Sequence, residues 1–250
     1  MKIEGSVALV TGANRGIGRA LVAEFLARGA ARVHAAARDP HSLEPVIALA
    51  PDRVDPMELD LDRPGTITAA AASAPDVTIV VNNAGTHGVG HLLEMDLDVV
   101  EKVLMTNCVG PLLVMRAFAH MLQHRGGGAI VNVVSTAAFG ATPSQGSYPA
   151  SKAALHSMTQ AVRADLAPYG ISVHGVYPGP VDTDMLDYVI GHEPTFGDFP
   201  RATPRDVARA VLDGVEAGDE DIFPDPFALE IEAEWRADPK ALAARLAAIE

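Results

Sequence analysis

The chain has 250 residues, of which 48% are hydrophobic, and a formal net charge of −13 at pH 7. So large a negative charge would be repelled by phosphate backbones and anionic membrane surfaces, which argues against nucleic acid or peripheral lipid as a partner. The single cysteine, Cys108, excludes an intrachain disulfide, and no signal peptide or membrane-spanning apolar run is recognisable. These features lead us to expect a cytoplasmic protein.

Short apolar runs rich in β-branched residues alternate along the chain with longer, alanine-rich amphipathic stretches. The predicted strands are residues 7–10, 33–37, 54–61, 77–81, 129–134 and 171–176, and the predicted helices are residues 20–28, 66–74, 99–122, 147–167 and 204–217. Strands that are apolar on both faces are typical of a parallel sheet covered by helices on each side. The predicted fold class is therefore α/β, with a doubly wound parallel sheet.

The C-terminal part of the chain departs from this alternation. An acid-rich stretch precedes residues 239–249, which are predicted as a short helix. We expect residues 224–250 to form a C-terminal extension, either an interface arm or a flap over the pocket. Residues 184–203 contain aromatic, proline and glycine residues and are expected to form a substrate loop. One open sheet can absorb the whole length, so a single dinucleotide-binding and catalytic domain, 1–250, is predicted.

A glycine-rich turn, TGANRGIG at residues 11–18, connects the first predicted strand to a helix. Because Gly12, Gly16 and Gly18 lack side chains, the backbone can turn tightly and approach a pyrophosphate, and the helix N-terminus supplies amide donors. A dinucleotide-binding motif requires this placement between strand and helix. The turn therefore predicts a site for a dinucleotide cofactor.

Tyr148 and Lys152 lie four residues apart in a predicted helix, so their side chains share one face. A tyrosine of ordinary pKa, roughly 10, exchanges protons poorly near neutrality, and a nearby cation favours the phenolate. Ser135 follows the predicted strand 129–134 at the edge of the sheet where this helix begins. The two hydroxyl groups can therefore converge on one carbonyl group.

The glycine-rich turn, an NNAG turn at residues 82–85, Ser135 and the Tyr148–Lys152 pair follow one another in this order. In these features the chain resembles the short-chain dehydrogenase/reductase family, from about residue 6 to about residue 183. The resemblance implies a Rossmann fold with about seven parallel strands and an enzyme that transfers a hydride between a nicotinamide cofactor and a carbonyl carbon. Carbonyl reduction by NADPH is the expected direction, with alcohol oxidation as its reverse.

Four side chains would carry the catalysis that this resemblance implies. The Ser135 hydroxyl would orient the substrate oxygen, and Tyr148 would act as general acid and base. Lys152 would lower the pKa of the tyrosine and bind the nicotinamide ribose, and Asn107 would hold a water for proton relay. Alternatively, Ser135 is a cap at a strand end, Asn107 a buried amide that satisfies the backbone, and Lys152 a surface charge.

Cofactor choice depends on the end of the second strand, where family members that select NAD carry an acidic residue. Here Ala37 occupies that position and Arg38 follows it, with Arg15 of the glycine-rich turn as a second basic neighbour. Arginine pairs well with a 2′-phosphate, so NADP(H) is the expected cofactor. Asp39 leaves an alternative to this cofactor choice open, because its carboxylate could neutralise Arg38 or bind the ribose itself.

The resemblance extends to the other cofactor contacts. Asp60 would accept from the adenine amino group, Asn83 would contact the adenosine ribose, and Val181 and Thr183 would hold the nicotinamide. The complete predicted set is Gly12, Asn14, Arg15, Gly16, Ile17, Gly18, Arg38, Asp60, Leu61, Asn83, Ala84, Gly85, Tyr148, Lys152, Pro178, Gly179, Val181 and Thr183.

No metal site is expected, because His87 and His91 have no acidic or cysteine partners nearby in the sequence; we expect a flexible loop near the pocket mouth there. Substrate contacts are expected from Thr136, Phe139 and Gln145, from the loop after residue 85 and from residues 185–199. The pocket would be mostly apolar without an arginine clamp, since Arg201 is the one basic residue nearby, which favours neutral ketones or aldehydes.

Two other functions stay open. One is a non-catalytic NADP-binding regulatory or scaffold protein, against which Tyr148 and Lys152 count. The other is an epimerase or dehydratase of the same fold, although the chain lacks the large C-terminal substrate domain such relatives usually carry. By analogy with the family, helices 99–122 and 147–167 are expected to form contacts between subunits in a homodimer or homotetramer.

Overall fold

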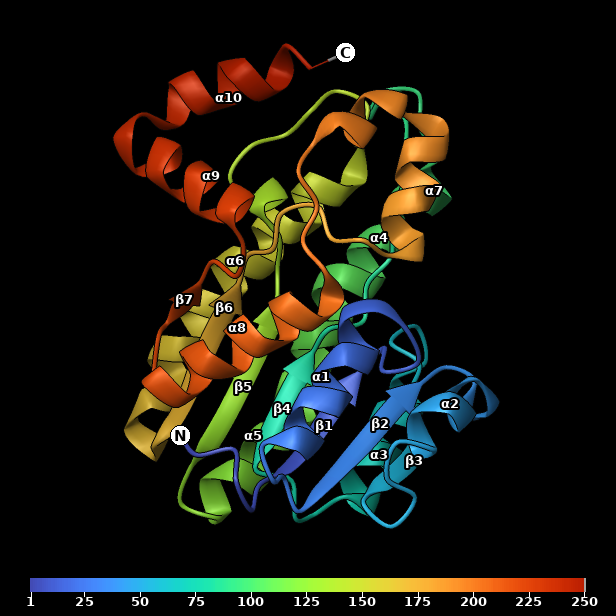
Figure 1. The fold of residues 1–250 in the computed structure, drawn as a ribbon, viewed down its shortest axis with the longest axis vertical. Coiled ribbons are helices and arrows are strands. Elements are labelled where there is room, and N and C mark those ends of the chain that lie inside the picture. The colour runs from blue at the N-terminus through green and yellow to red at the C-terminus, as the bar shows by residue number, and fades with distance from the viewer. Residues whose placement is uncertain (250) are drawn as a thin grey trace.

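A computed structural model describes residues 1–249 and contains one seven-stranded sheet in the order β3-β2-β1-β4-β5-β6-β7 (Figure 1). All neighbouring strands are parallel. The strands are β1 (Val7–Thr11), β2 (Arg32–Ala37), β3 (Val54–Glu58), β4 (Ile79–Asn82), β5 (Gly128–Val133), β6 (Ile171–Val176) and β7 (Asp221–Ile222). The predicted α/β class and doubly wound parallel sheet are confirmed.

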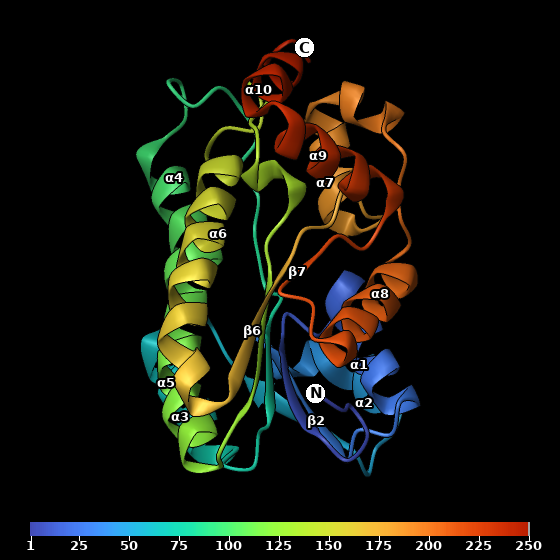
Figure 2. The same cartoon turned by 90° about the vertical axis from the view of Figure 1, so that its left-hand side faces the viewer.

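Helices cover both faces of the sheet (Figure 2). One face carries α1 (Gly16–Ala27), α2 (Glu44–Ile47) and α8 (Pro204–Ala217), and the other carries α3 (Pro64–Ser73), α4 (Leu97–Leu104), α5 (Gly110–His124) and α6 (Ser147–Leu166). Side chains of a strand alternate between the faces, so Val10 packs in the α1 and α8 core and Leu9 in the core of α3 and α5. This two-sided burial explains the uniformly apolar strands.

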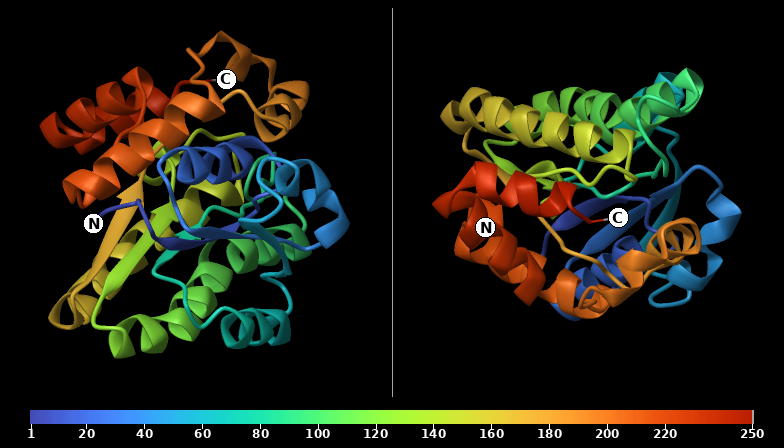
Figure 3. Two further views of the ribbon diagram at one scale, coloured as in Figure 1. Left: turned by 60° about the horizontal axis from the view of Figure 1, so that its bottom comes forward. Right: turned by 90° about the horizontal axis from the view of Figure 1, so that it is seen from above.

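The remaining helices gather at the carboxyl ends of the strands. They are α7 (Asp184–His192), α9 (Pro226–Ala237) and α10 (Pro239–Ala247), and 3-10 turns lie at Pro40–Leu43, Thr136–Ala138, Ala167–Tyr169 and Pro194–Asp198. Seen from above, the red C-terminal helices and the orange α7 segment surround the same edge of the sheet (Figure 3). None of the helices in residues 1–249 is both long and apolar enough to cross a membrane.

Two predicted elements differ from the structure. The helix predicted at 99–122 is interrupted by a π-turn, Met105–Val109, which separates α4 from α5. Single π-turns inside helices are frequent at functional sites, and this one contains Asn107. The segment expected as a substrate loop contains the helix α7, which Thr183 caps by accepting a hydrogen bond from the Leu186 amide.

The chain order places a crevice beside β1. It proceeds from β1 outward to β2 and β3 and then crosses back to β4 on the other side of β1. Helices on opposite faces diverge at such a reversal, and ligands of open α/β sheets bind there, at the carboxyl ends of the strands.

Candidate active site

A cavity of about 480 Å³ occupies this crevice. Every residue of the predicted cofactor set lines it, as do Ser135, Thr136 and Gln145. The structure therefore brings together residues from position 12 to position 183. Asn107 is the exception among the predicted catalytic residues, because it does not line the cavity.

The glycine-rich turn is formed by close backbone contacts. Gly12 and Gly16 have φ angles of 64° and 52°, a region that side chains disfavour. A Cβ atom on Gly18 would lie 2.1 Å from the Gly12 carbonyl oxygen. No side chain caps the N-terminus of α1, which follows directly. Its amide groups line the cavity without a protein anion, which fits the binding of a pyrophosphate.

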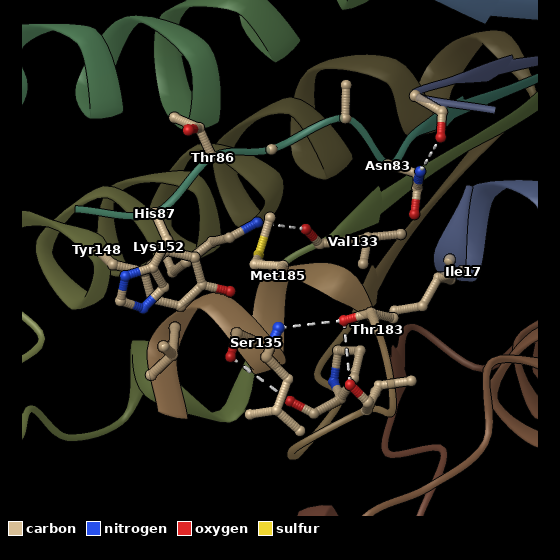
Figure 4. Close-up of a pocket in the computed structure, with 18 of the residues that line it drawn as sticks. Ile17, Asn83, Thr86, His87, Val133, Ser135, Tyr148, Lys152, Thr183 and Met185 are labelled. Carbon is tan, nitrogen blue, oxygen red and sulfur yellow. Dashed lines mark hydrogen bonds between the residues drawn. The ribbon is translucent and has the colours of Figure 1, made fainter. Parts of the chain in front are cut away.

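Asn83 holds this turn from the end of β4. Its Nδ2 donates to the Thr11 and Gly12 carbonyl oxygens at 2.8 and 3.2 Å (Figure 4). The Thr11 hydroxyl in turn accepts from the amides of Asn83 and Ala84. The Asn83 amide group is therefore used for the shape of the glycine-rich turn, in addition to any contact with a ribose.

Ser135 and Tyr148 meet at the floor of the cavity. Ser135 follows β5 and caps the 3-10 turn by accepting from the Ala137 amide at 3.2 Å. Burial raises the pKa of Tyr148, and the neighbouring Ser135 hydroxyl opposes that rise. The phenol is consequently protonated near neutrality and can donate a proton to an oxygen placed beside it.

Lys152 lies beneath this pair. It is 4% exposed, and its Nζ donates to the Val133 carbonyl oxygen at 2.9 Å. The ammonium lies 5.6 Å from the centre of the Tyr148 ring, and burial lowers the pKa of Lys152 to about 8. Burial dominates the pKa of the Tyr148 phenol, and the Lys152 ammonium donates to a backbone carbonyl oxygen. That Lys152 lowers the pKa of the tyrosine stays a prediction.

Asn107 is fully buried in the π-turn. Its Oδ1 accepts from the Thr86 amide at 2.8 Å, and its Nδ2 donates to the Thr86 carbonyl oxygen at 2.8 Å and to Ser151 Oγ at 3.0 Å. The side chain thus fixes the loop after β4 to α6. This arrangement is the alternative considered from the sequence, a buried amide that satisfies the backbone, and no group of the amide faces the cavity.

Of the two arginines predicted to bind the cofactor, one forms an ion pair with an acidic residue and the other does not. Arg38 is exposed at the cavity wall and forms no ion pair within residues 1–249. Asp39 does not neutralise it, because the carboxylate caps the following turn through the His41 amide at 3.0 Å. Arg15, predicted as a second basic neighbour, instead pairs with Asp184 at 2.8 Å. Arg38 is thus a cation left available to a phosphate, and so is Lys102, which also lines the cavity and forms no ion pair within residues 1–249.

Asp60 lines the same cavity. Its carboxylate accepts from Arg63 Nε at 2.9 Å and from the Asp62 amide at 3.1 Å. Burial would raise its pKa, but these two hydrogen bonds and the charges of Arg63 and Arg38 lower it overall. Asp60 is therefore an ionised acceptor at the groove, although part of its capacity is already used.

Asp225 was not recognised from the sequence. It is 6% exposed, and its carboxylate accepts from the Gly179 amide at 2.9 Å and from the Ala228 amide at 2.8 Å. It thereby caps α9 and fastens that helix to the Pro178–Val181 segment of the cavity. An aspartate before a proline, at Asp225-Pro226, is a helix-start signal that could have indicated this cap.

The substrate side of the cavity is closed by apolar side chains. They come from α7, the turn after it, α9 and the C-terminal end, and include Met185, Leu186, Val189, Phe196, Phe199, Phe227, Ile231, Leu246 and Ile249. Of the two alternatives for the C-terminal extension, the one that covers the pocket agrees with this lining. Phe139 was predicted to contact substrate but packs away from the cavity, against Tyr177, Phe223 and Trp235. Tyr188 is half exposed and does not line the cavity.

His87 was predicted to lie in a flexible loop near the pocket mouth, yet it lines the cavity and stacks on Tyr148. Its ring lies against the ring of Tyr148 in the close-up of the site (Figure 4). Within residues 1–249, no group of three histidine, cysteine or acidic side chains is placed to hold a metal ion.

Comparisons with known proteins agree with this geometry. Residues 6–193 match a family model described as short chain dehydrogenase. The chain is 34% identical to the short chain dehydrogenase pigC of Monascus ruber over 74% of this chain and 65% of that protein. It is 32% identical to a 3-alpha-(or 20-beta)-hydroxysteroid dehydrogenase of Mycobacterium tuberculosis, over 75% of this chain and 74% of that one.

A solved structure extends the likeness to the whole chain. The short chain dehydrogenase from Burkholderia cenocepacia, solved in complex with NADP, is 40% identical, with a TM-score of 0.89 over 98% of this chain and 99% of that one. The family match spans more than half of the chain, and the fold is shared almost end to end. This protein belongs to the short chain dehydrogenase family and is an oxidoreductase with a Rossmann fold.

Proposed function

We propose that this protein is a carbonyl reductase that uses NADPH to reduce a small, neutral, apolar ketone or aldehyde, and that oxidises the alcohol in reverse. The observation that carries the proposal is the placement of Ser135 beside Tyr148 in a cavity whose far side is apolar. A carbonyl oxygen that reaches this pair would meet two hydroxyl donors. Its hydrocarbon body would lie against the apolar wall.

Each side chain has a distinct part in this reaction. Ser135 donates to the carbonyl oxygen and fixes its position. Tyr148 transfers its phenolic proton to the oxygen as negative charge develops there. Lys152 keeps a positive charge beneath the phenol, which stabilises the phenolate after proton transfer. A bound nicotinamide cofactor would supply the hydride, and the uncapped N-terminus of α1 would hold its pyrophosphate.

Arg38 supports the choice of NADP(H) over NAD(H). Its guanidinium is exposed at the groove without an ion pair in residues 1–249, and the preceding residue is alanine where an acid would select NAD. A guanidinium binds the 2′-phosphate with charge-assisted hydrogen bonds. The Burkholderia cenocepacia relative, which is in complex with NADP, agrees with this choice.

The charges near the substrate side support a neutral substrate. Arg201, the basic residue nearest to the substrate loop, lies 3.6 Å from Asp182 and 3.9 Å from Asp187. It is therefore compensated and offers no free clamp for a carboxylate or phosphate.

A homodimer or homotetramer is proposed as the assembly. Leu97, Val99 and Val109 are large apolar side chains that stay exposed on α4 and the π-turn, at 66%, 39% and 38%. The segments that carry them pack against α5 and α6, the helices expected to meet between subunits. Burying such a surface against a second copy would be favourable.

The test is the oxidation of NADPH and of NADH, followed by absorbance, with neutral ketones, aldehydes, diketones and quinones. Turnover with NADPH preferred is the expected result. A preference for NADH would contradict the role of Arg38, and tight NADPH binding without turnover of any carbonyl would contradict the proposed reaction.

A further inference from the structure

His87 lies face to face with the tyrosine of the active site. The imidazole and phenol ring centres are 4.2 Å apart, and the ring planes differ by 20°. Stacking of two aromatic rings is favourable, and it restricts the rotation of both. The contact joins the loop after β4 to the first turn of α6 (Figure 4).

The imidazole is uncharged at neutral pH. Burial and the positive charge of Lys152 together lower the pKa of His87 to about 4, against a smaller opposing effect of the Gly88 backbone. Nδ1 is buried and has no hydrogen-bond partner in residues 1–249. A neutral ring beside the phenol adds no positive charge near Lys152 and is not a proton source for a reaction at pH 7.

The loop that carries His87 is packed closely against α6. A Cβ atom on Gly88 would lie 2.8 Å from Met95 Cε and 3.1 Å from Ser147 Oγ. The Gly90 amide donates to the Ser144 carbonyl oxygen at 2.7 Å. These contacts fix the backbone that follows His87 without involving Tyr148, so the loop can hold the imidazole against the phenol ring.

We propose that His87 is a positioning residue whose neutral ring fixes the plane of the Tyr148 phenol and keeps solvent from one of its faces. The inference rests on the proposed role of Tyr148 as proton donor. A proton donor displaced by about 1 Å can lose about 100-fold in rate. The flat aromatic ring of His87, and not one of its nitrogen atoms, positions the phenol.

Three variants distinguish the effect of the aromatic ring of His87 from the effect of its nitrogen atoms. His87→Phe keeps an aromatic ring, His87→Asn keeps a polar group without the ring, and His87→Ala removes both. We expect His87→Phe to keep kcat within about 3-fold, with the pH profile of kcat unchanged, and the other two variants to lower kcat about 10- to 100-fold. The Kd for NADPH, measured by fluorescence, should stay the same in all three.

Loss of activity in His87→Phe with retention in His87→Asn would overturn the proposal, because a ring nitrogen would then be required. An unchanged kcat in His87→Ala would overturn it as well. An NMR measurement separates this inference from the proposed function, because the Tyr148 ring protons, assigned with Tyr148→Phe, should lose an upfield ring-current shift in His87→Ala. If the wild-type protein shows this shift but reduces no carbonyl, the proposed function is wrong, but His87 still positions the Tyr148 ring. If the Tyr148 resonances do not move in His87→Ala, His87 does not position the ring.

Discussion

Tyr148 contacts three groups that together determine its protonation and its orientation. The Ser135 hydroxyl lowers the pKa of its phenol, Lys152 lies under its ring, and His87 stacks on the ring. Because burial raises the pKa of the phenol, the protonated form is the one held at neutral pH. Reduction requires that form, since the tyrosine must give a proton to the carbonyl oxygen.

Arg38 provides the test of cofactor choice. Arg38→Ala removes a guanidinium that we propose binds the 2′-phosphate, a charged hydrogen bond of about 1.5–3 kcal/mol. We expect a rise of about 10- to 100-fold in the Kd for NADPH and little change for NADH, measured by fluorescence titration. The control Arg19→Ala removes an exposed arginine of α1 that does not line the cavity, and should change neither value. Equal losses for both cofactors in Arg38→Ala would contradict the assignment.

His87 also predicts a pH dependence of stability. Its pKa in the folded state is about 4, below the ordinary value of 6.5. Between these values the unfolded chain binds a proton that the folded chain does not, so stability is lost as the pH falls from 6.5 to 4. The loss can reach about 3 kcal/mol and should be absent in His87→Phe.

Urea unfolding of both proteins near neutral pH and near pH 4.5 measures this difference. The free energy of unfolding should fall more steeply with acidification in the wild type than in His87→Phe. Parallel decreases in the two proteins would show that the imidazole titrates normally.

At the scale of elements, the C-terminal helices form a wall of the substrate side. Asp225 fastens α9 to Gly179, and a Cβ atom on Gly140 would lie 2.5 Å from Leu246 Cδ1 of α10. Ile249, just after α10, is half-buried and lines the cavity. The size of the side chain at this position should therefore limit the size of the substrate.

Ile249→Trp tests this expectation. The larger side chain should lower kcat/KM for a bulky apolar ketone at least about 10-fold more than for a small one, which is the order of discrimination that apolar pockets achieve. The control Leu229→Trp alters an exposed residue of α9 that does not line this cavity. An unchanged ratio of the two kcat/KM values in Ile249→Trp would show that the C-terminal segment does not limit the substrate.

The parallel sheet covered by helices and the gathering of the predicted cofactor residues at one cavity could be predicted because each depends on local pattern or motif. Uniformly apolar strands indicated a covered parallel sheet, and the glycine-rich turn lies where the prediction placed it. The π-turn at Met105–Val109 could not be predicted, since its sequence continues the apolar pattern of a helix. The stacking of His87 on Tyr148 and the burial of the Asn107 amide depend on contacts between segments distant in the chain, for which no local signal exists.

At the scale of the whole molecule, the exposed apolar residues beside α5 predict self-association. The wild-type protein should elute in size-exclusion chromatography with light scattering at a multiple of 26.1 kDa. Val109→Glu places a charge on the proposed contact surface and should shift the protein toward the monomer. Leu49→Glu changes an exposed leucine just after α2 and is the matched control. A monomeric wild type at micromolar concentration would refute the assembly.

The two faces of the sheet contribute different parts of the enzyme. The face with α1 carries the glycine-rich turn, and the face with α4, α5 and α6 carries Asn107, Tyr148 and Lys152. The crevice lies between them at the carboxyl edge. A substitution at the tyrosine should therefore impair proton transfer more than cofactor binding, to which the glycine-rich turn of the opposite face contributes.

The most direct test of the account is Tyr148→Phe, which removes one oxygen atom and keeps the ring that His87 stacks upon. We expect the Kd for NADPH to stay within about 3-fold and kcat for carbonyl reduction to fall by at least about 100-fold, the usual contribution of a general acid. Tyr169→Phe, at an exposed tyrosine after α6, should behave as the wild type. A Tyr148→Phe enzyme with a near-normal kcat would contradict the assignment of Tyr148 as the proton donor, and with it the mechanism.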